Sequence, residues 1–248
     1  MSAMIEVRDL HKTLGNQEVL CGVDLQVEKG QTIVVIGRSG SGKSVLLKHF
    51  IGLLKPTRGE VLVEGQPIAG LPERKLGEIR KKVGILFQSG ALFDSMNVEG
   101  NLAFPLWEAG LRNKKEIADR VAEALEMVDL SGEQKKMPED LSGGMRKRVG
   151  LARTIVSRPA CILYDEPTTG LDPINSDSIN HLIRRLQKRL QVTSVVVTHD
   201  MKTAFHTADH IAYLHEGRIY FYGDAKGLQD SQDPVVQDFI VGRSGESD

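Results

Sequence analysis

Hydrophobic and polar residues alternate through the first quarter of the chain, which predicts short strands. Residues 4–8 and 19–27 follow this alternation, and Gly30 turns the second stretch into a third strand at 31–36. A hairpin is expected at 57–68, where apolar and polar residues alternate on either side of a turn. We expect these N-terminal strands to pair antiparallel.

Later in the chain the expected strands are short, continuous apolar runs. Such runs are typical of parallel strands that are buried on both faces, with helices between them. They occur at Val83–Phe87, Cys161–Tyr164, Thr193–Thr198 and Ile211–Leu214.

Between Gln88 and Pro159 the apolar spacing becomes helical. One set of apolar residues recurs at steps of four, four and three, which places it on one face of a helix: Ile117, Val121, Leu125 and Val128. A second helix is expected over Gly143–Ser157, ending before Pro159.

These patterns predict an α/β fold with an antiparallel β lobe and an inserted α-helical lobe. We expect a single domain at 4–242. Its core and β lobe are expected at about 4–88 and 158–242, its helical lobe at about 89–157, and a polar tail at 243–248.

Composition excludes several classes of protein. The 248 residues include 32 Lys and Arg against 33 Asp and Glu, a net charge of −1, which argues against a chain that coats nucleic acid. No apolar run approaches the roughly 20 residues that cross a bilayer, and the N-terminus lacks a signal-peptide pattern, so we expect a cytoplasmic protein. Cys21 and Cys161 lie in apolar surroundings and are interpreted as small core residues.

The strongest chemical motif is G-R-S-G-S-G-K-S at 37–44. It follows an apolar strand and precedes a helical stretch, Val45–Leu53, as a phosphate-binding P-loop requires. The expected nucleotide-binding residues are Gly37, Arg38, Ser39, Gly40, Ser41, Gly42, Lys43, Ser44 and Val45. Lys43 is expected to reach the β- and γ-phosphates, and the Ser44 hydroxyl to bind Mg²⁺. The alternative is a Gly-Ser turn.

A second motif, C-I-L-Y-D-E, is an apolar strand that ends in two acids. After a P-loop, Asp165 is expected to hold Mg²⁺ and Glu166 to orient or deprotonate the attacking water. The alternative is a pair of acids that cap a helix.

The third motif, L-S-G-G-M, opens the expected helix at Gly143. Ser142 with the N–H groups of Gly143 and Gly144 would form a second anion site at a helix N-terminus. The alternative is an ordinary serine cap.

Together with G-L-D at 170–172 and T-H-D at 198–200, these motifs occur in the order of an ATP-binding cassette (ABC) ATPase, which the chain resembles over roughly residues 4–242. The resemblance implies a P-loop NTPase core, ATP and Mg²⁺ as ligands, and a head-to-tail dimer in which each ATP lies between the P-loop of one subunit and the L-S-G-G-M loop of the other. A homodimer is expected.

The resemblance also implies roles for single residues. Gln88 would contact Mg²⁺ or the water and sense a membrane partner, and His199 would contact the γ-phosphate beside Glu166. Ser142, Gly143 and Gly144 would bind the partner's ATP, and Asp172 would cross the interface.

Two positions depart from the family pattern. Leu14 stands where most cassettes carry an aromatic residue that stacks on adenine, and Met145 replaces the usual Gln. His206 and His210 are four residues apart, and we interpret them as a solvated helix face rather than a metal clamp because no third ligand is evident.

A narrower resemblance is to the Mla branch, whose ATPases drive phospholipid transport between Gram-negative membranes. It rests on L-F-Q-S-G-A-L-F at 86–93, M-N-V at 96–98, P-L at 105–106, L-S-G-G-M, and D-P-V-V-Q-D-F at 233–239. It implies a permease, an MCE-type substrate-binding protein and a small accessory protein as partners, and a peripheral position on the cytoplasmic face of the inner membrane. Direct nucleic-acid binding is not expected.

The stretch after Gln88 is more apolar than a surface loop should be, which favours a docking surface for a permease helix. The residues concerned are Ala91, Leu92, Phe93, Met96 and Val98. The alternative is that they pack the helical lobe.

The predicted function is ATP hydrolysis that drives a lipid permease. The alternatives are another ABC importer or exporter, a non-transport ABC ATPase, and a catalytically inactive nucleotide-binding scaffold.

Overall fold

The computed structural model describes residues 3–243, which divide into two compact units. The first unit contains the residues up to 79 and those from 193 onward, and the second contains residues 80–192. Apart from Arg243, the expected polar tail lies outside the described residues. The expected boundaries of a helical lobe at 89–157 stay a prediction.

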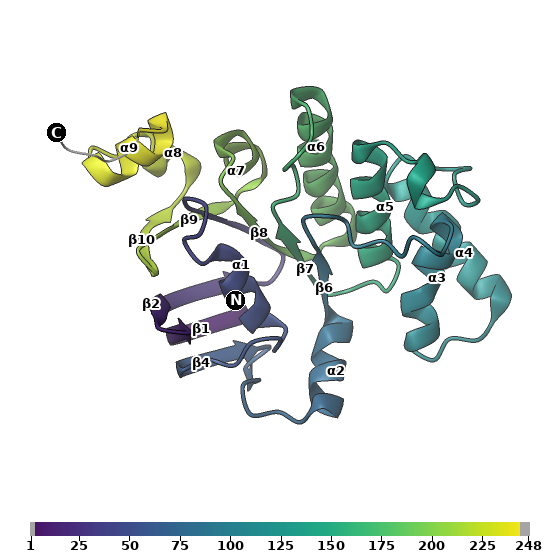
Figure 1. Cartoon of the computed structure of the whole chain (residues 1–248), viewed down its shortest axis with the longest axis horizontal. Helices are drawn as coiled ribbons and strands as arrows, with labels where there is room; N and C mark the ends of the chain where they lie inside the picture. The colour runs from purple at the N-terminus through teal and green to yellow at the C-terminus, as the bar shows by residue number, and fades with distance from the viewer. Residues whose placement is uncertain (1–2, 244–248) are drawn as a thin grey trace. The chain divides into compact units, whose positions relative to one another are not determined.

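An antiparallel sheet in the first unit forms the predicted β lobe. Its strand order is β2-β1-β4-β5, of which Figure 1 labels the first three. The bounds are β1 Ala3–Leu14, β2 Gln17–Glu28, β4 Arg58–Val63 and β5 Gln66–Pro67. β1 and β2 run further than the alternating pattern indicates. Their pairing shifts register between Val7 and Leu10, where Asp9 has a φ of 44°, and this bulge lets the ladder resume beyond the break in alternation.

The parallel strands of the first unit surround β3, Thr32–Ile36. Its neighbours are β8, Thr193–Thr198, and β9, His210–His215, both parallel to it, and β10, Arg218–Gly223, is antiparallel to β9. Every residue of β3 and β8 is buried, and the continuous apolar run predicted this for β8. The expectation that the strand at 31–36 pairs antiparallel with the other N-terminal strands is wrong, because β3 is apolar at almost every position and lies between two parallel neighbours. The helices of this unit are α1 Lys43–Phe50, α7 Met201–Thr207, α8 Ala225–Gln229 and α9 Pro234–Val241.

The second unit combines two parallel strands with helices. Its strands are β6 Val83–Leu86 and β7 Cys161–Asp165. Its helices are α3 Val98–Glu108, α4 Lys114–Met127, η1 Pro138–Asp140, α5 Gly143–Ile155 and α6 Pro173–Leu190, and α2 Glu73–Lys82 runs from the first unit into the second. α3, α4 and α5 pack against one another (Figure 1). The predicted apolar face of α4 is buried.

The α/β fold with an antiparallel lobe and a helical lobe is therefore confirmed. Both cysteines are free. Cys161 is buried in β7, as expected of a core residue, whereas Cys21 in β2 is only half-buried. Among residues 3–243, no helix is both long enough and apolar enough to cross a membrane.

Candidate functional site

The G-R-S-G-S-G-K-S loop joins the end of β3 to the start of α1. Gly37 is packed so closely that a Cβ atom there would lie 2.6 Å from the Leu214 carbonyl oxygen and 2.6 Å from Ser41 Oγ. Gly42 has a φ of 101°, which L side chains rarely adopt. The loop therefore requires glycine at both positions, and its backbone curls tightly at the N-terminus of α1.

The polar groups of this loop fit an anion. Ser41 Oγ is buried and has no hydrogen-bond partner among the described residues. Lys43 Nζ donates to the carbonyl oxygens of Gly37 at 2.8 Å and Arg38 at 3.0 Å, so a buried ammonium lies against the first turn of the loop. A cation, backbone N–H groups and a helix N-terminus in one place suit a phosphate chain.

His199 belongs to the same edge of the first unit. Its neighbour Thr198 pairs with Ile36, the last residue before the P-loop, so both segments leave the sheet side by side. Thr198 Oγ1 accepts from the Asp200 N–H at 3.0 Å, and Asp200 caps α7 by accepting from the Lys202 N–H at 2.9 Å. The T-H-D motif is therefore a strand end and a helix cap that hold an exposed histidine between them.

In the second unit, Gln88 and the two acids leave parallel strands at one edge. Leu86 in β6 pairs with Tyr164 in β7, so the residues that follow each strand emerge together. Glu166 has a φ of 49°, an unusual left-handed conformation for a glutamate, and its Oε2 accepts from Thr169 Oγ1 at 3.3 Å. This strain occurs at the residue that the sequence assigns to water activation.

The donor set expected for Mg²⁺ is chemically suitable. Ser44, Gln88 and Asp165 offer a hydroxyl, an amide carbonyl and a carboxylate, and hard divalent cations prefer oxygen ligands of these kinds. Ser44 lies in the first turn of α1 in the first unit, whereas Gln88 and Asp165 lie in the second.

L-S-G-G-M begins α5, as predicted. Ser142 is the N-cap, and its Oγ accepts from the Met145 N–H at 3.3 Å. Ser142 and Gly143 are exposed, whereas Gly144 is buried because Asn175 lies over it, and a Cβ at Gly144 would approach the Asn175 Oδ1 to 2.9 Å. The motif therefore presents a capped helix N-terminus on the surface of the second unit.

Asn175, which lies over Gly144, also connects Asp172 to this motif. Asp172 caps α6 by accepting from the N–H groups of Ile174 and Asn175, both at 3.0 Å, and Asn175 Nδ2 donates to its other oxygen. These bonds, those from Asn175 first, lower the pKa of Asp172. Sequence reasoning did not single out Asn175, although the D-P-x-N spacing is a helix-cap signal.

Lys147 is a second residue that sequence reasoning missed. Only 6% of it is exposed, and its ammonium donates to the carbonyl oxygens of Gln88 and Glu166. Burial lowers the pKa of Lys147, while the charges of Asp165 and Glu166 act in the opposite direction. In the sequence Lys147 is one of three consecutive cations on a helix, and nothing in that pattern marks it as buried.

The apolar stretch after Gln88 is partly exposed. Phe93 is 37% exposed, packs edge-on against Phe104 with centroids 4.8 Å apart, and lies 4.6 Å from the guanidinium of Arg153. Val98 is fully buried in α3, so its assignment to the surface patch is wrong. Val98 follows the helix cap Asn97, and its side chain faces the core.

Buried Asn101 holds this stretch in place. Its Oδ1 accepts from the Phe93 N–H at 2.8 Å, and its Nδ2 donates to the carbonyl oxygens of Phe93 at 3.1 Å and Met96 at 2.9 Å. The backbone of this stretch is therefore hydrogen-bonded by a buried side chain, which fixes the conformation of the exposed surface.

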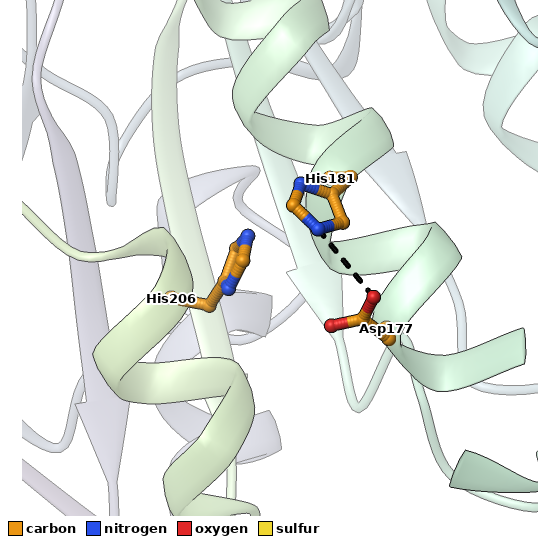
Figure 2. Close-up of side chains that lie close together, drawn as sticks. All are labelled: Asp177, His181 and His206. Carbon is orange, nitrogen blue, oxygen red and sulfur yellow. Dashed lines mark ion pairs between the residues drawn. The ribbon is translucent and has the colours of Figure 1, made fainter. Parts of the chain in front are cut away.

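His206 and His210 do not share a helix face, so that interpretation is wrong for His210. α7 ends at Thr207 and His210 opens β9, where its ring stacks on Tyr222 with centroids 5.5 Å apart. Another histidine, His181 on α6, lies 3.4 Å from Asp177 one turn earlier (Figure 2). Both side chains of this pair are 64% exposed, so the pair contributes little to stability.

Comparison with known proteins decides the family. Residues 20–169 match the ABC transporter family. The chain belongs to that family. ABC cassettes hydrolyse ATP, and this chain is accordingly an ATPase.

Three similar proteins illustrate the relationship. The "Probable ribonucleotide transport ATP-binding protein mkl" of Mycobacterium leprae is 42% identical over 98% of this chain and 70% of its own length. The "Intermembrane phospholipid transport system ATP-binding protein MlaF" of Haemophilus influenzae is 41% identical over 97% of this chain and 91% of its own. A dimeric ATP-binding cassette, MJ0796, solved with ADP and Pi, is 32% identical with a TM-score of 0.81, over 89% of this chain and 98% of its own.

Leu14 provides a test of base recognition in this ABC ATPase. It ends β1 and is 41% exposed, at the place where most cassettes stack an aromatic ring on adenine. Leu14→Tyr is expected to tighten ATP binding by about 0.5–1.5 kcal/mol, the scale of an aromatic pair. Titration with ATP and GTP measures this. Leu53→Tyr, at another exposed leucine, is the control, and unchanged affinities in Leu14→Tyr would show that the base is held elsewhere.

Proposed function

We propose that this chain is the ATP-hydrolysing subunit of an ABC transporter whose permease moves lipid between membranes, with phospholipid as the cargo. The observation that carries the lipid assignment is the 41% identity to a protein named for intermembrane phospholipid transport, over nearly the full length of both chains. The relative named for ribonucleotide transport makes a nucleotide the competing cargo.

The first unit supplies the nucleotide cradle. Gly37–Val45 binds the phosphates through backbone N–H groups, and Lys43 moves its ammonium from loop carbonyls to the β- and γ-phosphates. Its burial strengthens this attraction because little water screens the charge. Ser44, Gln88 and Asp165 are the residues that would hold Mg²⁺, which would supply positive charge to the phosphates.

Hydrolysis depends on groups at strand ends. Glu166 orients or deprotonates the attacking water, and the Thr169 hydroxyl fixes its carboxylate. His199, held between a strand end and a helix cap, donates to the γ-phosphate and stabilises the charge that develops there. Gln88, two residues after the end of β6, would contact the water or Mg²⁺.

A second copy of the chain completes each site. Ser142, Gly143 and Gly144 place a helix N-terminus at the surface of the second unit, where it binds the γ-phosphate of the partner's ATP, and Asp172 lies beside it. The likeness to a dimeric cassette supports this arrangement. Two nucleotides would then close a homodimer and hydrolysis would reopen it.

The remaining partners follow from the transporter assignment. The exposed stretch around Phe93 receives a cytoplasmic helix of the permease. An MCE-type protein and a small cytoplasmic accessory protein complete the assembly. The chain is then peripheral, on the cytoplasmic face of the inner membrane.

Glu166→Gln tests the hydrolytic assignment. The change keeps the size and hydrogen bonding of the side chain but removes the carboxylate, so turnover is expected to fall by roughly 10²–10⁴. ATP should still bind, and the closed dimer should accumulate. Phosphate release and size-exclusion chromatography measure the two effects, with exposed Glu126→Gln as the control. Wild-type turnover in Glu166→Gln would remove Glu166 from this role and would favour another base.

Phe93→Asp tests the docking surface. A carboxylate in the partner's apolar helix site would cost a few kcal/mol, so the variant should lose its membrane partner during copurification. It should fold, because Arg153 lies beside the new carboxylate and can pair with it, and it should keep its basal hydrolysis. Leu53→Asp, at an exposed apolar residue of the first unit, should leave copurification unchanged. Unfolding would assign Phe93 to the core, and retained membrane association would place docking elsewhere and favour a non-transport ATPase.

Copurification from membranes with the permease tests the cargo. Lipid extraction of the complex is expected to yield phospholipid above the level in a mock preparation from the same membranes. A nucleotide in place of lipid would overturn the lipid assignment while leaving the ATPase assignment intact.

A further inference from the structure

A buried ammonium connects the backbone at Gln88 with the backbone at Glu166. Lys147 projects from the second turn of α5 and donates to the carbonyl oxygen of Gln88 and, at 3.4 Å, to that of Glu166. It is 6% exposed. Burying a charge costs free energy unless the charge is paired and hydrogen-bonded. The hydrogen bonds to these two carbonyl oxygens therefore offset the cost of burying Lys147.

The same face of α5 fixes the rest of the loop that starts at Gln88. One turn beyond Lys147, a Cβ at Gly150 would lie 3.0 Å from the Gly90 carbonyl oxygen, so the loop and helix backbones are in close contact. One turn further, Arg153 donates to the Ala91 carbonyl oxygen and covers the Phe93 ring. Residues 147, 150 and 153 therefore attach the loop from 88 to 93 to a single helix.

The second acceptor of the Lys147 ammonium belongs to a residue with a strained backbone. Glu166 has a φ of 49°, and such a conformation persists only where the surroundings enforce it. Its carbonyl oxygen accepts from the Thr169 N–H at 3.3 Å and from Lys147. The direction of this peptide determines where the glutamate side chain points.

We propose that Lys147 is a positioning residue that sets Glu166 for hydrolysis and links its orientation to the loop that receives the permease helix. This rests on the proposed roles of Glu166 and of the Phe93 surface. A partner that displaces the loop would move one acceptor of the ammonium and thereby shift the other. The helix that carries the partner-facing L-S-G-G-M motif would thus also connect docking to hydrolysis.

Lys147→Met removes the charge and the donor but keeps a long apolar stem. We expect its kcat for ATP to fall by about 10- to 100-fold, the scale of a small misplacement of a reacting group, with KM within about twofold because the P-loop is untouched. Lys147→Arg, which can donate to the same carbonyls, should recover most of the loss. Lys188→Met, at an exposed lysine of α6, is the matched control and should behave as wild type.

A double-mutant cycle separates positioning from general damage. If Lys147 acts through Glu166, Lys147→Met should change the residual turnover of Glu166→Gln by less than about twofold. Equal losses in both backgrounds would overturn the proposal, as would a kcat of Lys147→Met within twofold of wild type.

Amide hydrogen exchange gives a readout that needs no activity. Lys147→Met should speed exchange in the peptides that contain residues 88–93 and 166–169 and leave α4 unchanged. If Lys147→Met speeds exchange but Glu166→Gln keeps the wild-type turnover, the link exists and Glu166 is not the water-activating group. Unchanged exchange at 88–93 and 166–169 would show that Lys147 does not hold the two segments.

Discussion

Buried parallel strands constrain where this protein can place its polar chemistry. β3 and β8 are buried along their whole length, and each ends in a short segment that must leave the sheet at a fixed point. The P-loop follows β3 and His199 follows β8, so their spacing is determined by ladder hydrogen bonds rather than by loop flexibility. In the second unit β6 and β7 impose the same constraint on Gln88, Asp165 and Glu166.

Local electrostatics, not overall charge, makes the chain suitable for a polyanion. Its net charge is −1, so long-range attraction of ATP is weak. The two proposed anion sites combine helix N-termini at α1 and α5 with glycines that bring the backbone close, and the first also has the buried ammonium of Lys43. The L-S-G-G-M cap faces solvent and has no cation of this kind within its own motif, which suits a group that meets phosphate only when a partner brings it.

Much of this fold could be predicted because its signals are local. Apolar runs marked β3, β7 and β8, and the four-residue spacing marked α4. The polar motifs could be located because each lies where a strand ends or a helix begins, and such junctions have their own residue preferences. Their proposed roles remain predictions for the experiments above.

Contacts between distant segments could not be predicted in this way. Lys147 and Asn175 each contact a residue far away in sequence, and nothing in their neighbours distinguishes them from solvated residues. His210 shows the converse error, since a four-residue spacing indicates one helix face only if the helix continues, and α7 ends at Thr207. The bulge at Asp9 likewise depends on the partner strand.

The left-handed backbone at Glu166 has a consequence for the interpretation of mutants. Side chains branched at Cβ tolerate a φ of 49° poorly, whereas glycine and asparagine tolerate it well. Replacement by valine or threonine would alter the backbone as well as remove the carboxylate, so a loss of activity would have two inseparable causes. Replacement by glycine would relax the strain and free the following turn, which could change nucleotide release independently of the chemical step. The conformation of one peptide thus limits which substitutions at position 166 report only on the loss of the carboxylate.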